Sequence, residues 1–238
     1  MIVDGGGTTF AGSTSTSIRD YSNLADTVDL TNTSPSNYHT RMMGGDDRVT
    51  LSTVRTGGFS NKVNGNVGDD TFFSKAGSLC RDFILGGSEN DRIDLSNSAA
   101  AGDWQNGNNG NDTIIGAVNN ASFSILRGGS EDDNIIIKSG SSHIAVGDLG
   151  KDLINTQGKS RIVCRTDNGA ATQLIGQADE IIGFSPKKDK IYIPGVSNNT
   201  YLYPSAGSGS TTYLQSTSFT NGTPSKSYIV GFRNTTVQ

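Results

Sequence analysis

The sequence is poor in several residue types, and each shortage excludes a class of protein. Its 238 residues include only 2 cysteines, 5 prolines, 2 histidines and 1 tryptophan. So few prolines exclude collagen and proline-rich linkers. No apolar run approaches the roughly 18 residues of a membrane span. The N-terminal residues MIVDGGGTTF have neither a basic n-region nor an apolar h-region, so we expect no cleavable secretory signal there.

Apolar material and positive charge are also scarce. Hydrophobic residues make up 33% of the chain, the formal net charge is −4 and the pI is about 5.1. A strongly basic nucleic-acid binder is therefore excluded. All 23 acidic residues lie between Asp4 and Asp189, so an acidic body precedes a mildly basic, Ser/Thr-rich end. A body this acidic and this poor in apolar residues needs a reason to be compact, and a bound cation is the obvious candidate.

What the sequence does contain is an internal period marked by aspartate. The spacings between successive members are 21, 23, 21, 21, 21 and 19 residues, for Asp26, Asp47, Asp70, Asp91, Asp112, Asp133 and Asp152. Two residues after each Asp comes an apolar residue, namely Val28, Val49, Phe72, Ile93, Ile114, Ile135 and Ile154. A fixed period of this length is typical of a repeat architecture, and the alternation after each Asp predicts a short strand with one buried face.

A glycine-rich turn precedes most of these aspartates, and a second strand leads into each turn. The turns read GGDDRVTL (44–51), GNVGDDTFF (65–73), GGSENDRID (86–94), GNNGNDTII (107–115), GGSEDDNII (128–136) and GDLGKDLIN (147–155). In the second strand, Phe83, Trp104, Ile125 and Ile144 recur with the same period, so we expect them to stack as one inward ladder.

These features predict an all-β fold, a right-handed parallel β-solenoid or β-roll of about seven coils of ~21 residues with a C-terminal β cap. The expected organisation is an N-terminal cap (1–22), the repeats (23–183), and a closing segment with a β-hairpin cap (184–238). Repeat and cap fill nearly all of the sequence, so we expect no separate catalytic domain.

The turns resemble the nonapeptide G-G-x-G-x-D-x-U-x of RTX, or hemolysin-type calcium-binding, proteins. The segment DEIIGFSPKKDKIYIPG (179–195) is similar to the one that closes the repeat array in secreted RTX proteins, including cyanobacterial ones. The resemblance implies several Ca²⁺ ions bridging neighbouring coils through carboxylates and turn carbonyls. The implied carboxylate ligands are Asp47, Asp70, Asp91, Asp112, Asp133 and Asp152. The implied carbonyl ligands are Gly45, Gly65, Gly68, Gly86, Gly87, Gly107, Gly110, Gly128, Gly129, Gly147 and Gly150.

The sequence departs from the RTX pattern in two ways. RTX coils usually contain two nonapeptides, whereas a coil of about 21 residues here contains one, so all calcium turns would line a single edge. Glu89 and Glu131 replace a glycine that tolerates positive φ, so these turns either differ in geometry or gain a ligand. The extra acids Asp46, Asp69 and Asp132 either ligate or only raise the local field. Alternatively, the turn Asp and Asn residues only cap turns and stack as ladders.

The remaining reactive residues carry no motif. Cys80 and Cys164 lie about four coils apart, too far for a disulfide, so we expect two buried thiols. His39 and His143 belong to no zinc or triad pattern and are expected to be structural.

The expected function is a non-enzymatic, calcium-stabilised structural or surface-decoration protein, extracellular or on a virion. Its expected partners are calcium and a protein partner or second copy on a cell or virion surface, not nucleic acid. One alternative is an adhesin or carbohydrate-binding module, secreted by a type I system, with an aromatic platform around Tyr201–Tyr213. The other is a polysaccharide-acting enzyme with carboxylates outside the repeat phase, such as Asp82, Asp94 or Asp103.

Overall fold

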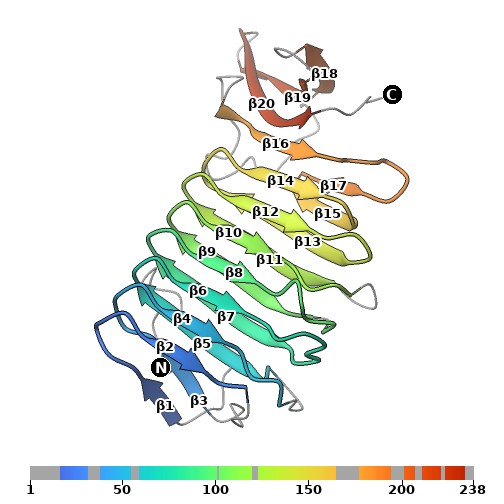
Figure 1. Cartoon of the computed structure of the whole chain (residues 1–238). Helices are drawn as coiled ribbons and strands as arrows, with labels where there is room; N and C mark the ends of the chain where they lie inside the picture. The colour runs from blue at the N-terminus through green and yellow to red at the C-terminus, as the bar shows by residue number, and fades with distance from the viewer. Residues whose placement is uncertain are drawn as a thin grey trace.

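The chain winds into a stack of parallel coils, seen side on in Figure 1. This computed structural model describes residues 17–31, 38–54, 59–100, 102–119, 123–164, 177–193, 201–206, 211–220 and 223–233. The period is about 21 residues and the stack has about six turns. The predicted fold class, an all-β parallel solenoid, is therefore confirmed, with about six turns where the sequence predicted about seven.

Two long sheets form opposite walls of the stack. The nine-stranded sheet contains, in spatial order, β1 (Ser17–Asp20), β3 (Tyr38–Arg41), β5 (Asn61–Val67), β7 (Asp82–Ser88), β9 (Trp104–Asn109), β11 (Ser124–Ser130), β13 (Ser142–Asp148), β15 (Lys159–Val163) and β17 (Lys190–Tyr192). The eleven-stranded sheet contains β2 (Thr27–Asp29), β4 (Arg48–Thr50), β6 (Thr71–Phe73), β8 (Arg92–Asp94), β10 (Thr113–Ile115), β12 (Asn134–Ile137), β14 (Leu153–Thr156), β16 (Asp179–Ile182), β20 (Thr223–Arg233), β19 (Thr211–Thr220) and β18 (Tyr201–Ala206).

Strand pairing keeps equivalent residues of successive coils in register. Ile114, for example, pairs with Ile93 on one side and with Ile135 on the other, in parallel. Because coil lengths match the period, each position of the repeat becomes a column of side chains along the stack. Chemistry that the sequence repeats every 21 residues is thereby gathered onto one line in space.

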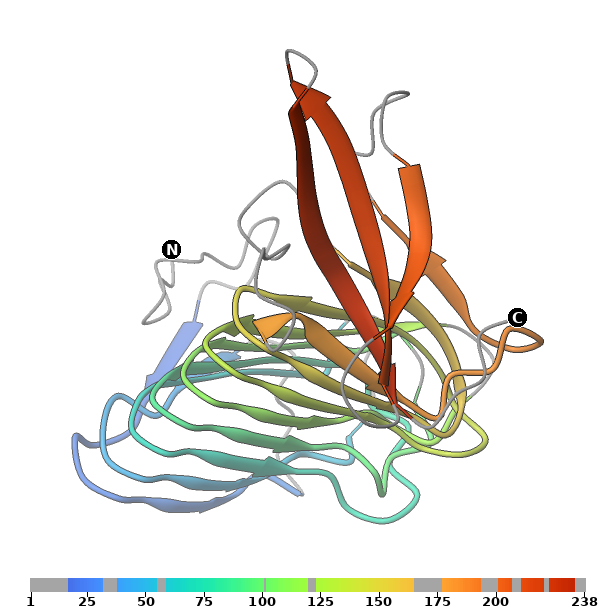
Figure 2. The ribbon, with the colours of Figure 1, turned by 90° about the horizontal axis from the view of Figure 1, so that it is seen from above.

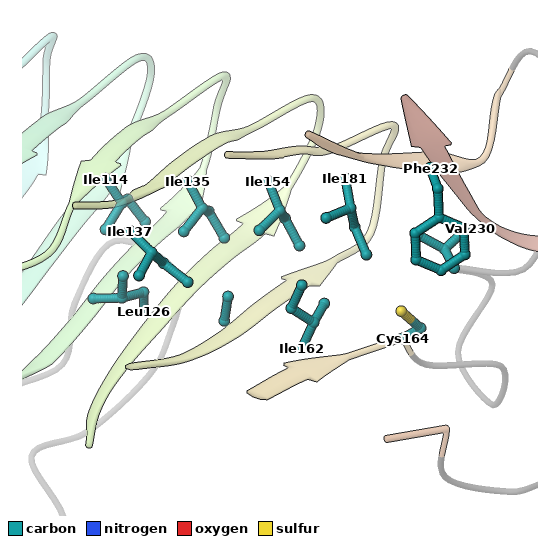
Figure 3. Packing of buried hydrophobic residues seen from close by; sticks show 11 residues of the cluster. Ile114, Leu126, Ile135, Ile137, Ile154, Ile162, Cys164, Ile181, Val230 and Phe232 are labelled. Carbon is teal, nitrogen blue, oxygen red and sulfur yellow. The ribbon is translucent and has the colours of Figure 1, made fainter. Parts of the chain in front are cut away.

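The core is the space between the two sheets. Figure 3 shows Ile114, Ile135, Ile154 and Ile181 in a row, facing residues such as Ile162 from the other sheet. Each fully buried side chain of this size contributes about 1.5–3 kcal/mol of hydrophobic stabilisation. The column predicted from the D-x-apolar pattern is therefore the inward face of the eleven-stranded sheet.

The second predicted ladder faces the other way. Phe83, Trp104, Ile125 and Ile144 do stack in register, but they lie half-buried on the outside of the nine-stranded sheet. The Phe83 and Trp104 rings are stacked and nearly parallel, with their centroids 5.6 Å apart. The prediction of an inward ladder was wrong because Phe83 begins an apolar run, Phe83–Leu85, in which alternation does not identify the inward face. Its successor Ile84 points inward instead.

Strand β20 closes the C-terminal end of the stack. It pairs in parallel with β16, which places Val230 beside Asp179 and Phe232 beside Ile181. Apolar residues of the cap thus continue the columns of the solenoid, and Arg233 forms an ion pair with Glu180. Figure 2 shows β19 and β20 extending away from the coils. The side chains of 201–229, with the predicted tyrosine platform, lie outside the described residues.

Both cysteines are buried thiols without a disulfide, as predicted. Cys164 lies at the C-terminal end of the core shown in Figure 3. Burial raises the pKa of its thiol well above the ordinary value, so it remains protonated and unreactive at neutral pH.

One polar side chain interrupts the apolar interior. Gln105 is fully buried on the inward face of β9, between Ile84 and Leu126, and neither Oε1 nor Nε2 has a hydrogen-bond partner. The two large hydrophobic clusters meet near this coil. An unsatisfied buried polar group costs about 1–3 kcal/mol.

We therefore predict that Gln105→Leu raises the free energy of unfolding by about 1–2 kcal/mol, since leucine restores the apolar column. Chemical denaturation measures this change. The matched control is Asn106→Leu, because the Asn106 amide donates to Asn108 Oδ1 at 2.5 Å and its removal should not stabilise. A loss of stability in Gln105→Leu would contradict the prediction.

Candidate functional site

The periodic aspartates form one continuous buried ladder along an edge of the solenoid. In each coil the backbone N–H of the Asp donates to Oδ1 of the Asp in the next coil. The donor–acceptor distances, 2.6–3.0 Å, belong to the pairs Asp26–Asp47, Asp47–Asp70, Asp70–Asp91, Asp91–Asp112, Asp112–Asp133, Asp133–Asp152 and Asp152–Asp179. The six aspartates predicted as ligands are therefore brought together.

The other carboxylate oxygen of these six aspartates has no hydrogen-bond partner. Each Oδ2 is buried, and in five of the six it points at the glycine that opens the same turn, whereas Met42 holds that position in the turn of Asp47. A Cβ built on Gly107 would lie 1.9 Å from Asp112 Oδ2, and the equivalent glycines Gly65, Gly86, Gly128 and Gly147 are equally crowded. At Gly86 the carbonyl oxygen of Gly107, one coil on, approaches the same point. Glycine is therefore required here to make room for the carboxylate.

Burial raises the pKa of every carboxyl in this set. The pKa rises to about 6 at Asp47 and Asp152, about 7 at Asp112, about 8 at Asp70, about 9 at Asp133 and about 10 at Asp91. Desolvation is the largest cause, and the backbone N–H bond to Oδ1 opposes it. Charge on neighbouring ladder members adds to the rise. The interior therefore favours either a proton on these groups or a compensating cation.

Both ends of the ladder are closed. At the N-terminal end Asp26 Oδ2 accepts from Ser22 N–H at 2.9 Å and from Ser22 Oγ at 2.8 Å. At the C-terminal end Asp179 accepts from Asp152, and Val230 lies beside it. The sequence pattern missed Asp179 as a member because it follows Asp152 by 27 residues. The sequence feature that identifies Asp179 is the apolar residue two positions later, Ile181, as in the other ladder coils.

At two positions of the turn, glycine and non-glycine residues alternate from one coil to the next. At the second turn position φ is 73–79° for Asn66, Asn108 and Asp148 but 132–134° for Gly87 and Gly129. At the fourth position the glycines are Gly68, Gly110 and Gly150, and Glu89 and Glu131 have φ of 79° and 74°.

This alternation follows from contact between coils. A Cβ on Gly110 would lie 1.8 Å from the Glu89 carbonyl oxygen of the preceding coil, and one on Gly150 would lie 1.9 Å from that of Glu131. A left-handed residue in one coil thus requires glycine at the same position in the next. Glu89 and Glu131 keep the positive φ of the turn, and Glu131 also accepts a hydrogen bond from Gly110 N–H at 2.6 Å.

A second ladder runs on the exposed side of the same edge, formed by the residues just before the buried aspartates. Here the backbone N–H donates to the side chain of the preceding coil, so its direction is opposite to that of the buried ladder. The pairs are Asp69–Asp46, Asn90–Asp69, Asn111–Asn90, Asp132–Asn111 and Lys151–Asp132, at 2.8–3.1 Å. Asp46, Asp69 and Asp132 thus have a structural role whether or not they ligate.

The carboxylates outside the repeat phase do not form one site. Asp82 and Asp103 are buried in a short ladder at the opposite corner. Asn61 Nδ2 donates to Asp82 Oδ1 at 2.6 Å, and the Asp82 N–H donates to Asp103 Oδ1 at 2.9 Å. Burial raises the pKa of both carboxyls. Asp94 instead lies on the outer face of β8, paired with Arg92 at 2.6 Å, so these three do not converge.

Both histidines are buried. His143 Nε2 lies 2.8 Å from the Ala117 carbonyl oxygen, and burial lowers the pKa of its imidazole. Burial lowers the pKa of His39 to about 4, with Lys62 adding to the effect. Within the described ranges, no group of three or more His, Cys, Asp or Glu side chains is arranged to hold a metal ion.

Fold and site together define a parallel β-solenoid with a buried aspartate ladder. No protein-family model matches the chain, and no significant match occurs among curated proteins or solved structures. In the described part of the chain, no helix is long and apolar enough to cross a membrane.

The ladder can be tested for its fit to the calcium that the resemblance implies. Calcium takes 6–8 oxygen ligands, and the donors here are carboxylate and carbonyl oxygens. The six orphaned Oδ2 atoms, all buried and five of them beside a glycine, fit a hard cation. Because Oδ1 already accepts a hydrogen bond from a backbone N–H, Oδ2 is the carboxylate oxygen that still lacks a partner. Backbone carbonyls would have to supply the other protein ligands.

Proposed function

We propose that this chain is a non-enzymatic structural protein of the RTX type, a rigid solenoid stabilised by calcium along its aspartate edge. The observation that carries the proposal is the column of six buried carboxylate oxygens without a hydrogen-bond donor. Repulsion within an uncompensated column of buried carboxylates would destabilise the stack. Bound calcium would turn this electrostatic repulsion into attraction. The ladder aspartates and the turn carbonyls of adjoining coils would hold the ions.

The same geometry supports a structural role over a catalytic one. The ladder carboxylates are occupied with backbone groups, and Asp82 and Asp103 are buried with partners of their own. Weak multi-oxygen calcium sites operate near 10⁻⁴–10⁻³ M, which is an extracellular concentration. We therefore place the protein outside the cytoplasm, on a cell surface or on a virion, in contact with a protein partner or further copies.

The proposal predicts a calcium-specific rise in stability. The protein, stripped with EGTA, is titrated with calcium while far-ultraviolet circular dichroism and thermal melting are recorded, with magnesium as the control ion. Calcium, but not magnesium, should raise the melting temperature by 10 °C or more, on the order of a few kcal/mol for a chain of this size. An identical melt in EGTA and in calcium, with no calcium found by metal analysis, would refute the proposal.

A single substitution separates the roles of charge and shape. Asp91→Asn keeps an acceptor at Oδ1 but replaces the orphaned Oδ2 by a donor facing the carbonyl oxygen of Gly107. In EGTA at pH 8 the variant should melt at a higher temperature than the parent, and its response to calcium should be smaller. Asp94→Asn, on the outer face of the same coil, should leave the calcium response unchanged.

A further inference from the structure

The C-terminal end of the nine-stranded sheet carries an unbalanced cationic surface. Lys159 and Arg161 on β15 and Lys190 on β17 are all exposed. Arg161 and Lys190 are register partners, so the two like charges lie opposite each other on neighbouring strands. We call these three residues, with Tyr192, the basic face.

Within the described part of the chain, no ion pair joins Lys159, Arg161 or Lys190 to a carboxylate. The nearest acid in sequence, Asp189, is buried, where its Oδ1 accepts from Ser160 N–H at 2.9 Å. Like charges opposite each other in a sheet are destabilising. The arrangement therefore costs free energy that an anionic partner would recover.

Aromatic rings orient and extend this surface. The Arg161 guanidinium lies over the Phe123 ring, 4.2 Å from its centroid, and Lys159 Nζ is 5.9 Å from the same centroid. Such contacts hold the cations in place. Tyr192 lies two residues after Lys190 on β17, so the two side chains are on the same face of the strand. The Tyr192 side chain is 64% exposed. Cations at the spacing of the coils, about 4.8 Å, thus adjoin an accessible aromatic ring.

We propose that the basic face binds a linear anionic polysaccharide bearing sulfate or carboxylate groups. A polyanion gains affinity from counterion release at each neutralised charge. Surface ion pairs with a second copy contribute only about 0–1 kcal/mol each, too little for three cations to hold two copies together. The Tyr192 ring offers an apolar surface to a sugar ring. The bases of duplex DNA are stacked inside the helix, so the exposed Tyr192 ring favours a sugar chain over that polyanion. This inference does not depend on calcium.

The test measures binding of the full chain to dextran sulfate, with uncharged dextran as the backbone control and duplex DNA as the competing polyanion. The experiment is run in calcium-containing buffer at about 50 mM salt, after circular dichroism has shown that each variant keeps its β spectrum. The parent should bind dextran sulfate and not dextran. The double variant Arg161→Gln/Lys190→Gln should bind at least tenfold more weakly, and its plot of log affinity against log salt should be shallower by about 2.

Two further variants keep the proposal falsifiable. Lys75→Gln/Lys138→Gln removes the same charge from turns elsewhere on the solenoid and should leave binding within twofold of the parent. Tyr192→Leu should weaken binding severalfold without changing the salt slope. Equal losses in the two double variants would show non-specific attraction and overturn the proposal. Equally tight, equally face-dependent binding of duplex DNA would overturn the choice of polysaccharide.

Discussion

In EGTA the melting temperature of this protein should fall steadily as the pH rises from about 6.5 to about 10, and saturating calcium should abolish that fall. The ladder carboxyls have pKa values of about 6 to about 10 in the fold, against an ordinary value of 3.8. The folded state therefore binds more protons than the unfolded state over this range. By linkage, stability is fully present below about pH 4 and is lost as the pH rises through the folded pKa values.

The expected size is several kcal/mol, since one unit of pKa shift corresponds to about 1.4 kcal/mol and the ladder groups are strongly buried. The histidines act in the opposite direction, because burial lowers their pKa values and stability rises with pH as they deprotonate. That contribution ends near pH 6.5, so data above this value isolate the carboxylates.

Calcium removes the fall in melting temperature because it binds the ionised carboxylate and competes with the proton. Its stabilising effect should therefore grow with pH, and the curves with and without calcium should diverge toward alkaline conditions. Asp91→Asn should flatten the curve in EGTA, since burial raises the pKa of Asp91 to about 10. A melting temperature independent of pH in EGTA would show that folding does not raise the pKa values of the ladder carboxyls, which contradicts this account.

Gly107→Ala should destabilise the protein by about 3 kcal/mol or more. The added Cβ would lie 1.9 Å from Asp112 Oδ2 and 2.5 Å from its Cγ. Neither atom can retreat without breaking the hydrogen bond between Asp112 Oδ1 and the Asp91 N–H. Overpacking of a buried site typically costs about 1–3 kcal/mol, and loss of the ladder bond adds to it. Equilibrium denaturation measures the change.

Two matched glycines separate the causes. Gly44→Ala meets no atom closer than 3.8 Å and has no positive φ, so it should be near neutral. Gly77→Ala has open space but a φ of +74°, so it reports the backbone cost alone, about 1 kcal/mol. If Gly107→Ala behaved like Gly77→Ala, the carboxylate would have room to move and the ladder would be less tightly packed than described.

Sequence reasoning predicted the fold because the solenoid repeats its chemistry locally. The 21-residue phase of the aspartates and of the apolar residues two positions later is sufficient to specify parallel coils and one buried column per phase. The pattern failed where apolar residues follow one another, as in the run Phe83–Leu85, since strand alternation then does not identify the inward face. It also failed at Asp179, where a longer connection between coils hides an unchanged phase.

The sequence by itself determined that the ladder residues lie on one line, that the thiols are buried and unpaired, and that the acids precede a basic end. Only the tertiary structure decided how the carboxylates are used. Oδ1 bonds to a backbone N–H one coil away, Oδ2 is left against a glycine, and a left-handed residue in one coil requires glycine in the next. The first and third of these features depend on contacts between residues about 21 positions apart, which become visible only when the coils are stacked, and the second depends on how each turn closes.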